Sequence, residues 1–555
     1  MLVLQSLFAS LVAAAAIPEK VLSVGRASSG SGGAVACEQA RCSDIGRKIL
    51  LSGGNAADSL IATVLCVGVM APYHTGIGGG GFALIRDKDG QYEAVDFRET
   101  APAAAFENMY EGNVEGSVHS GLAVAIPGEL RGLEYIHRKY SKLPWKALVA
   151  PAIDVARNGF KVSEDTLRYM EGFDFLREDP VWAEQWAPNG TLVGLGDTLY
   201  RKAYADTLEK IAEQGVDIFY TGSLAESMIS VIQAANGTMT LSDLENYKVV
   251  TGEALSTTYR GHTLYTTGIP SSGAVGISIL KTMEQYPIED WSDVNLSVHR
   301  LSEAMRFAYG ARLELGDPDF VSGAKAIEEI LLSEETARRT SQLILDDRTQ
   351  PVNVYDPRGV YVPDNHGTSH FSTVDADGMT TACTSTVNTL FGSQVMDPAT
   401  GIILNNEMND FSIPGVRNEF GFEPSEANYI RPGKRPLSSI TPFIISSPDS
   451  LFSIGAAGGS RIISSTAQAI WHLLEHNMTL AQSLSEPRLH DQLIPNRVTF
   501  EYAFDNGTVQ SMAERGHEVA WVKEGQSALQ GVGYQRGRFE AVGEPRQKSS
   551  GGSIA

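Results

Sequence analysis

Helix-type and strand-type hydrophobic patterns are interspersed along the whole chain. Apolar residues recur at intervals of three and four in six segments, which predicts helices at Ala40–Leu51, Ala57–Met70, Trp145–Arg157, Leu208–Glu213, Val298–Leu315 and Ile462–Glu475. Short apolar or alternating runs predict strands at Phe82–Arg86, Tyr92–Phe97, His262–Thr267, Phe371–Val374, Thr380–Thr384, Ile402–Leu404 and Val498–Tyr502. No internal repeat or long linker divides the chain, so helices and strands are expected to share one globular unit.

Two of the predicted strands form a hairpin. Phe371–Val374 and Thr380–Thr384 flank the turn sequence Asp-Ala-Asp-Gly at 375–378, which is typical of a tight connection. The segment 356–367, rich in Pro, Gly and Asp, is expected to be an exposed loop. A loop therefore runs directly into a strand at Thr368, and that junction is the candidate catalytic site.

The two ends of the chain differ from the rest. Residues 1–16 are uncharged, mostly apolar and end in four alanines, which predicts a signal peptide even though no basic residue precedes the apolar run. An uncleaved N-terminal anchor, in a membrane or in the vacuole, is the alternative. The last eight residues, 548–555, are polar and glycine-rich and are expected to fray.

Composition narrows the classes of protein. The chain has 555 residues, 43% hydrophobic and 20% charged, which excludes wholesale disorder and a polytopic membrane protein. A formal net charge of −22 makes nucleic acid an unfavourable partner. Four cysteines lack zinc-site spacing, and one disulfide is expected in an oxidising compartment. Five glycosylation sequons agree with export to the secretory pathway, at Asn189, Asn236, Asn295, Asn477 and Asn506.

Two motif-like strings do not carry their usual function. Residues 76–81 satisfy the dinucleotide pattern GxGxxG, but a helical segment precedes them and a strand follows, so close packing or a tight turn is the better explanation. His517-Glu518 begins an HExxH-like string, but Trp521 stands where the second histidine should be. Neither a cofactor nor a metal is therefore expected.

The string Gly-Thr-Ser-His at 367–370 is followed by Thr-Ser-Thr-Val-Asn at 384–388, and the hairpin would bring the two side by side. Together with other strings in the same order, they make the chain resemble the γ-glutamyltransferases (γ-glutamyltranspeptidases) of the N-terminal-nucleophile hydrolase superfamily. The supporting strings are GGNAAD at 53–58, HTGIGGG at 74–80, FRETAP at 97–102, NNEMNDFS at 405–412, PLSS at 436–439 and GAAGGS at 455–460.

The resemblance implies a fold and a maturation step. The fold would be α/β (α+β), a four-layer αββα sandwich with two stacked, mainly antiparallel sheets between helical layers. The precursor would cut itself between Gly367 and Thr368. After removal of the signal peptide 1–16, a large subunit 17–367 and a small catalytic subunit 368–555 would then form one globular unit.

Cleavage would also create the catalyst. A hydroxyl is a poor nucleophile until a base removes its proton. The new α-amine of Thr368 has an ordinary pKa of about 7.7–8.0, so it can act as that base near neutral pH. Nucleophile and base would therefore belong to one residue. Gly367, which has no Cβ, could take the strained backbone conformation that such an attack needs.

A γ-glutamyl group needs a cation for its α-carboxylate and donors for the oxyanion. The resemblance places the carboxylate clamp at Arg98, because a guanidinium can bind carboxylate in a two-pronged fork, with help from the hydroxyls of Ser438 and Ser439. It places the oxyanion hole at Gly458 and Gly459, whose N–H groups no side chain obstructs.

The α-ammonium of the substrate needs acceptors. The resemblance assigns this role to Asn388, Glu407 and Asp410, which would exclude substrates lacking the amine. Asn409 stands where the family often has Asp, which lowers the negative charge there. Thr386 matches the hydroxyl that orients Thr368.

The activity implied is that of a secreted γ-glutamyltransferase and glutathione hydrolase. Glutathione or another γ-glutamyl amide would acylate Thr368, and an amino acid, a dipeptide or water would take the γ-glutamyl group. Cys42 and Cys66 match a disulfide pair of animal members, whereas Cys37 and Cys383 have no assigned role.

Two alternatives remain open. A related acylase acting on glutaryl-cephalosporin side chains would process in the same way but would need no ammonium pocket. The other alternative is an unprocessed homologue that serves as a secreted binding or structural protein.

Overall fold

The computed structural model describes residues 22–26, 32–288, 292–356, 358–361, 367–417 and 423–555. At its centre lie two seven-stranded sheets in which every neighbouring pair is antiparallel. The first sheet contains, in spatial order, β21 (Gly551–Ile554), β2 (Gly33–Cys37), β11 (Gly367–Asp375), β12 (Thr380–Asn388), β3 (Gly80–Arg86), β4 (Tyr92–Phe97) and β7 (Val250–Glu253). The second contains β1 (Leu22–Arg26), β20 (Arg538–Val542), β19 (Ala528–Gln535), β15 (Ser450–Ala457), β14 (Phe443–Ser447), β9 (His262–Thr266) and β8 (Leu255–Tyr259).

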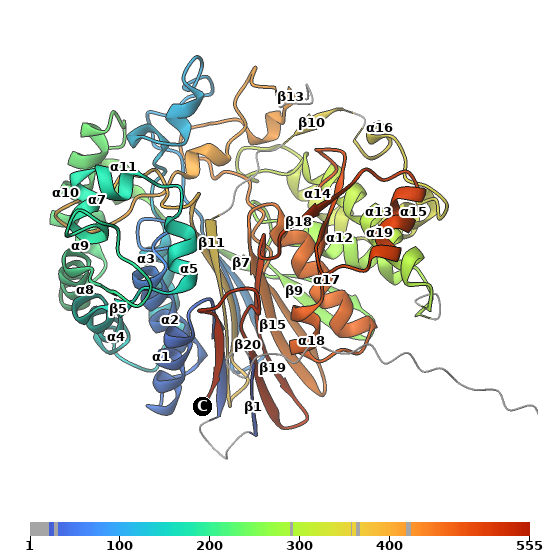
Figure 1. The fold of residues 1–555 in the computed structure, drawn as a ribbon, viewed down its shortest axis with the longest axis horizontal. Helices are drawn as coiled ribbons and strands as arrows, with labels where there is room; N and C mark the ends of the chain where they lie inside the picture. The colour runs from blue at the N-terminus through green and yellow to red at the C-terminus, as the bar shows by residue number, and fades with distance from the viewer. Residues whose placement is uncertain (1–21, 27–31, 289–291, 357, 362–366, 418–422) are drawn as a thin grey trace, which may run out of the picture.

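Helices cover the outer face of each sheet (Figure 1). Against the first sheet pack α1 (Ala40–Leu51) and α2 (Ala56–Met70), with α3 (Glu129–Tyr140), α4 (Trp145–Asn158) and α8 (Lys202–Gln214) on the same side. Against the second pack α12 (Gly273–Glu284), α17 (Arg461–Glu475) and α18 (Leu480–Ser485), with α13 (Val294–Arg312) beside α12. The predicted four-layer αββα sandwich is confirmed.

Smaller elements surround this sandwich. The helices are α5 (Glu164–Met170), α6 (Phe175–Glu178), α7 (Pro180–Trp186), α9 (Asp217–Tyr220), α10 (Ser223–Ala234), α11 (Leu241–Asn246), α14 (Ala324–Leu332), α15 (Glu334–Leu343), α16 (Val352–Tyr355) and α19 (Asn506–Glu514). The strands are β5 (Phe160–Lys161), β6 (Thr198–Leu199), β10 (Val360–Tyr361), β13 (Glu423–Pro424), β16 (Leu489–His490), β17 (Val498–Glu501) and β18 (Val519–Val522). Short 3₁₀ helices include η4 (Glu407–Asp410), which lies at the candidate site.

The observed elements correct two sequence-based expectations. Ile402–Leu404 is buried but is not a strand, because its hydrogen bonds to the preceding segment 393–397 form only an isolated bridge, between Met396 and Ile403, and no continuous ladder. The C-terminal tail does not fray, since β21 pairs with β2 at the edge of the first sheet. Gly552 also lets β21 approach β20 (Arg538–Val542) of the second sheet, because a Cβ there would lie 2.3 Å from the carbonyl oxygen of Ala541.

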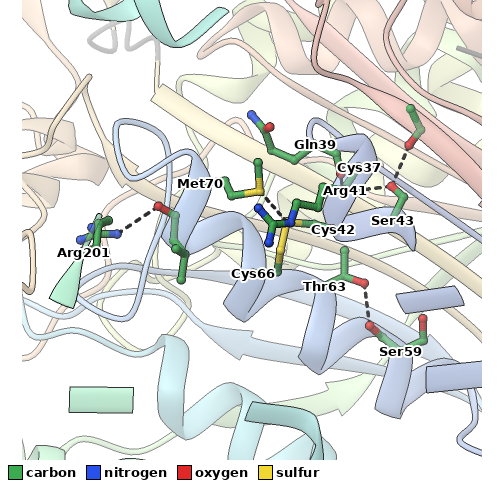
Figure 2. The surroundings of a disulfide bond; sticks show 12 residues. Cys37, Gln39, Arg41, Cys42, Ser43, Ser59, Thr63, Cys66, Met70 and Arg201 are labelled. Carbon is green, nitrogen blue, oxygen red and sulfur yellow. Dashed lines mark hydrogen bonds between the residues drawn. A yellow bond between two sulfur atoms is a disulfide. The ribbon is translucent and has the colours of Figure 1, made fainter. Parts of the chain in front are cut away.

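The cysteines behave as two classes. Cys42 and Cys66 form a disulfide that joins α1 to α2 (Figure 2). Cys37 and Cys383 are free and buried. Burial raises the pKa of the Cys37 thiol to about 12 and that of Cys383 well above its usual value, so both remain protonated at neutral pH.

Features tied to export are only partly visible. The predicted signal peptide, residues 1–16, lies outside the described residues. Within the part that the structure describes, no helix combines the length and apolarity needed to cross a bilayer. Four of the five sequon asparagines are exposed and Asn295 is half-buried.

Candidate active site

The predicted hairpin forms the centre of the first sheet. β11 and β12 pair in register from Ser369 opposite Ser385 to Val374 opposite Thr380. The register shifts at the start of β11, where Gly367 faces Asn388. This irregularity releases Thr368 from the regular ladder at the sheet end, and its side chain retains 6% exposure.

The carbonyl oxygen of Gly367 accepts hydrogen bonds from two hydroxyls. One comes from the adjacent Thr368 Oγ1, and the other comes from Thr386 Oγ1 on β12. The two hydroxyl oxygens lie 3.4 Å apart, and the Asn388 N–H donates to Thr386 Oγ1 over 2.8 Å. Thr386 therefore polarises the carbonyl that Thr368 would attack and lies close to the attacking oxygen.

Close packing leaves room only for glycine at two positions here. A Cβ on Gly367 would lie 2.4 Å from the carbonyl oxygen of Asn388. A Cβ on Gly79 would lie 1.9 Å from the carbonyl oxygen of Thr386. The glycine run at 76–81 therefore packs against the strand that holds Thr386, which confirms the close-packing explanation of that motif.

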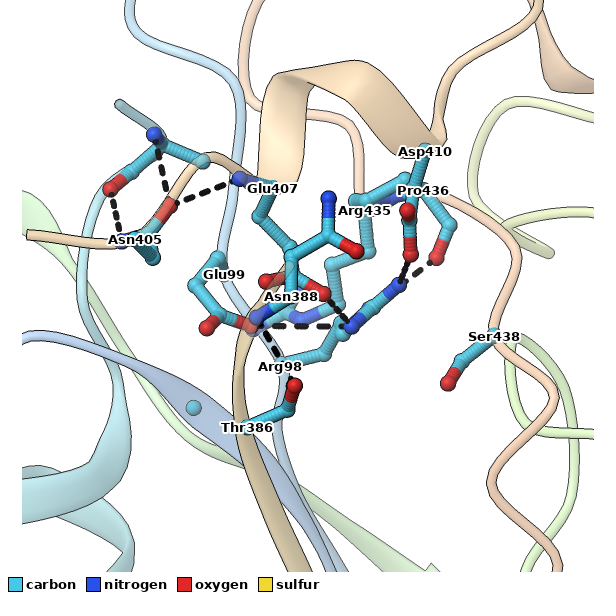
Figure 3. Close-up of polar contacts among 12 residues, drawn as sticks. Arg98, Glu99, Thr386, Asn388, Asn405, Glu407, Asp410, Arg435, Pro436 and Ser438 are labelled. Atoms are coloured by element: carbon cyan, nitrogen blue, oxygen red, sulfur yellow. Dashed lines mark hydrogen bonds and ion pairs between the residues drawn. The ribbon is translucent and has the colours of Figure 1, made fainter. Parts of the chain in front are cut away.

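Arg98 forms the charged centre of the site (Figure 3). It follows β4, is 1% exposed, and donates from Nη1 to Glu407 and from Nη2 to Asp410. Its Nε donates to the carbonyl oxygen of Pro436 over 3.3 Å, and Glu99 Oε2 lies 3.9 Å from Nη1. The proposed carboxylate clamp and the proposed ammonium acceptors thus bind one another.

Asn405 fixes the short helix η4 that presents the two acids. Its Nδ2 donates to the carbonyl oxygens of Gly78 and Ala125, each over 2.8 Å. Its Oδ1 accepts from the Glu407 N–H over 2.9 Å. Asn388 adds a second link, because its Nδ2 donates to the Asn406 carbonyl over 2.8 Å. The acids are therefore held on a rigid turn.

Burial and mutual repulsion dominate the electrostatics. Burial raises the pKa of Glu407 well above its usual value despite the nearby Arg98, and it also raises that of Asp410. Burial raises the pKa of Glu99 to about 8. Burial alone would lower the pKa of Arg98, but Glu407, Asp410 and Glu99 raise it above its ordinary value. Arg98 therefore keeps its charge, while burial opposes ionisation of the carboxyl groups around it.

The two predicted serines lie on the same cavity but differ in their contacts. The Ser439 Oγ accepts a hydrogen bond of 3.1 Å from Arg312 Nη2, and Arg312 Nε donates to Ser272 over 3.0 Å. The Ser438 Oγ accepts from the Ile440 N–H over 3.2 Å. A second guanidinium, which sequence reasoning missed, therefore supports this side of the site.

Gly458 and Gly459 connect β15 to α17 beside Thr368. Both have positive φ, 124° and 59°, which favours glycine. They immediately precede the N-terminus of α17, where helical N–H groups and the helix dipole favour negative charge. This location agrees with an oxyanion-binding role.

One small cavity gathers most of the predicted residues. Its volume is about 30 Å³, room for one or two water molecules. A γ-glutamyl group would require Arg98 to separate from its acids. Gly458 lines a separate, larger cavity that also contains Thr368. The predicted residues on the small cavity are Arg98, Thr368, Thr386, Asn388, Glu407, Asp410, Ser438, Ser439 and Gly459.

The sequence alone does not identify three supporting residues, Glu99, Arg312 and Asn405. Glu99 is adjacent to Arg98 in the sequence, but such a neighbouring pair is typical of a surface ion pair. Arg312 lies in the middle of the chain, and no local motif marks it. Asn405 belongs to a string that was recognised, yet its hydrogen bonds depend on distant loops.

Among the described residues, one group has the composition of a metal site although no metal was expected. His299, Glu303 and His517 place ligand atoms within 4.8 Å of one another. His299 Nδ1 and His517 Nε2 are hydrogen-bonded at 2.9 Å, and His299 Nε2 bonds the Leu345 carbonyl at 2.8 Å. A hydrogen-bond network therefore accounts for this group without an ion.

Comparison with known families and proteins gives a consistent result. The family model of γ-glutamyltranspeptidase matches residues 42–554. The chain is 49% identical to a glutathione hydrolase proenzyme of Arthroderma benhamiae over 540 residues, covering 94% of this chain and 92% of that protein. It is 46% identical to a glutathione hydrolase of Aspergillus flavus, covering 94% and 89%. The chain therefore belongs to the γ-glutamyltranspeptidase family of enzymes.

Solved structures agree on the fold. A cephalosporin acylase from Bacillus halodurans matches with a TM-score of 0.83 and 24% identity over 96% of each chain. The γ-glutamyltranspeptidase of Helicobacter pylori matches with a TM-score of 0.55 and 30% identity, covering 60% of this chain and 96% of that one. The first match shows the N-terminal-nucleophile hydrolase fold alone, since its identity is low.

Proposed function

We propose that this enzyme is a γ-glutamyltransferase and glutathione hydrolase that matures by cutting its own Gly367–Thr368 bond. The observation that carries the proposal is the position of Thr368. Its hydroxyl contacts the Gly367 carbonyl on one side and lies on the Arg98 cavity on the other. The chain's similarity to glutathione hydrolase proenzymes supports both parts.

Maturation would begin with attack of Thr368 Oγ1 on the Gly367 carbonyl carbon. The hydrogen bond from Thr386 stabilises negative charge on the carbonyl oxygen. The C–N bond breaks, the α-nitrogen of Thr368 takes a proton, and water opens the resulting ester. The products are the large subunit 17–367 and the small subunit 368–555, each retaining its place in the fold.

The catalytic cycle would reuse the same oxygen. The free α-amine of Thr368 accepts the hydroxyl proton, Oγ1 attacks the γ-carbonyl of the donor, and the departing amine receives the proton. The γ-glutamyl group then passes from the Thr368 ester to water or to the amine of an amino acid or dipeptide, and the C–Oγ1 bond breaks. Gly458 and Gly459 would stabilise the oxyanion in both steps.

Donor selection would follow from the exchange of partners around Arg98. The substrate α-carboxylate replaces Glu407 and Asp410 on the guanidinium, and the α-ammonium moves between the released acids. Because their pKa values are raised by burial, the acids need a cation nearby to ionise, which the ammonium supplies. Donors lacking either charge would leave a buried charge unpaired.

A matched pair of chromogenic amides tests the function. The γ-glutamyl anilide and the glutaryl anilide differ only in the α-amine. The proposal predicts release of the aniline from the first at least about a hundred times faster than from the second, since the amine pairs with two buried acids. Preference for the glutaryl compound would instead support the acylase alternative. No release from either would support an inert homologue.

We also propose that the protein is exported. The apolar segment 1–16, the exposed sequon asparagines and the Cys42–Cys66 disulfide support this. Fractionation of a culture with an antibody to the small subunit, with and without glycosidase, tests it. Unglycosylated protein confined to the cytosol would contradict export, and a retained glycoprotein would support the membrane or vacuolar alternative.

A further inference from the structure

A second cavity, of about 210 Å³, also contains Thr368. It shares no other lining residue with the cavity around Arg98. Gly458 lines this second cavity and Gly459 lines the first, so a carbonyl bound at the two glycines would face both spaces. One cavity can therefore hold the acyl part of a substrate while the other holds the amine part.

The two cavities differ in charge. The first contains Glu407 and Asp410, whereas no Asp or Glu is among the residues that line the second. Its charged lining residue is Arg168, and its other polar side chains include Gln526 and Gln547. His74, also on its wall, is already bound through Nδ1 to Glu38 at 2.8 Å. The larger cavity is therefore suited to an anionic group.

Arg168 is available for such a group. It lies on α5, is half-buried, and donates from Nη2 to the Gly525 carbonyl over 3.1 Å. Its guanidinium carbon lies 5.5 Å from the ring centre of Tyr169. Among the described residues, no carboxylate comes within ion-pair distance of Arg168, although the chain carries a net charge of −22. The guanidinium is thus positioned by a carbonyl and an aromatic ring while its charge remains unpaired.

Building on the proposed function, in which an amine leaves during acylation of Thr368 and another attacks the ester, we infer that Arg168, on the wall of this second cavity, selects amines that carry a free carboxylate. When the acyl-enzyme forms, the C–N bond of the donor breaks and the amine leaves through this cavity with the proton from Thr368 Oγ1. In transfer, an acceptor amine in the same cavity attacks the ester carbonyl, a new C–N bond forms as the C–Oγ1 ester bond breaks, and the proton of the amine returns to Oγ1.

The inference is tested with two acceptors that differ in one group, glycylglycine and glycylglycine amide. In the wild type, transfer to the acid should be favoured over transfer to the amide. Arg168→Gln should lower kcat/KM for the acid about tenfold, since a charge-assisted hydrogen bond is lost, and should change that for the amide less than twofold. Arg168→Lys should recover part of the difference.

Arg177→Gln serves as the matched control, because Arg177 is surface-exposed, pairs with Asp174 and Glu178, and does not line the cavity. An equal decrease in kcat/KM for both acceptors in Arg168→Gln, or no preference of the wild type for glycylglycine over its amide, would overturn the inference. Calorimetric binding of the two dipeptides to wild type and Arg168→Gln repeats the comparison without turnover. A lost binding preference would support the role of Arg168 even if the donor assay refuted the proposed function.

Discussion

Thr386 is the side chain that most directly supports the chemistry proposed for the Gly367–Thr368 bond. It donates to the Gly367 carbonyl, and its hydroxyl oxygen lies 3.4 Å from Thr368 Oγ1. Thr386→Val keeps the shape and removes the hydroxyl, so self-cleavage should slow about a hundredfold, as when an oxyanion donor is lost. Thr386→Ser should cleave within about tenfold of the wild-type rate. The measurement is the rate of appearance of the small subunit on a denaturing gel, and equal rates for the valine variant and the wild type would exclude this role.

Arg98 illustrates how a single residue can serve the precursor and the mature enzyme differently. Arg98→Lys keeps the positive charge beside Glu407 and Asp410 but loses the planar fork that a carboxylate needs. We expect normal self-cleavage and a rise of about tenfold or more in KM for the γ-glutamyl donor. Steady-state kinetics on the processed variant checks this. An unchanged KM would show that the α-carboxylate binds elsewhere.

Most site residues could be predicted because they stand in compact, recognisable strings, such as residues 367–370 and 405–412. The contacts that these residues make with one another could not be predicted. The resemblance gives Arg98, Glu407 and Asp410 separate roles, but the structure pairs them, because a buried charge needs a partner of opposite charge. Arg312 was missed, since its contact with Ser439 joins segments distant in the sequence.

At the scale of elements, the sheet interface contains a buried histidine with a predictable pH effect. His370 on β11 packs against Gly455 on β15 and bonds Thr384 and Ser372. Burial lowers its pKa to about 3. Below the ordinary value of about 6.5, the unfolded chain binds a proton there that the folded chain does not bind until about pH 3. The free energy of unfolding should therefore decrease as the pH falls through this window.

His370→Asn tests this contribution in the uncleaved Thr368→Ala chain, where unfolding stays unimolecular. The dependence of the unfolding free energy on pH between 6 and 4 should become shallower by about 1.4 kcal/mol per pH unit. His119→Asn, at an exposed histidine, is the control and should leave the slope unchanged. Denaturant titrations at several pH values give the slopes, and identical slopes for all three chains would contradict the contribution of His370.

Hydrophobic periodicity located the main helices well, since α1, α2, α4, α8, α13 and α17 all cover their predicted segments in whole or large part. Strand prediction failed at two segments, where contacts with distant parts of the chain determine the structure. The apolar run Ile402–Leu404 is buried without a ladder, because Leu404 and Asn405 bond Val395 and Gly78 in irregular turns. The tail at 551–554 is a strand because it pairs with β2 at the edge of the first sheet. The local sequence does not predict this pairing.

At the scale of the whole molecule, the proposed cut does not divide the fold. In the first sheet, β11 and β12 lie between β2 and β3, and in the second, β14 lies between β9 and β15, so strands from both sides of residue 367 are hydrogen-bonded in each sheet. Both cysteines of the Cys42–Cys66 disulfide precede the proposed cut, so this bond would not link the two fragments. The layered architecture itself was predictable only through the resemblance, since periodicity does not give strand order.

The subunits should therefore stay together after cleavage without a covalent link. Gel filtration in native buffer, with or without 1 M salt, should give one species, because hydrogen-bonded strands and apolar packing are little affected by salt. Denaturing gels with and without reductant should show two separate bands. Separation in native buffer, or a single band that splits only on reduction, would contradict this view of the assembly.

Thr368 is proposed both to cut the chain and to become the nucleophile that the cut releases. Intact-mass measurement of purified wild type, Thr368→Ser and Thr368→Ala, each incubated alone, distinguishes this role from cleavage by another group. We expect a fragment beginning at residue 368 in the wild type and, more slowly, in the serine variant, and a single uncleaved chain in the alanine variant. A Thr368→Ala chain that still separates at the Gly367–Thr368 bond would refute this role of Thr368.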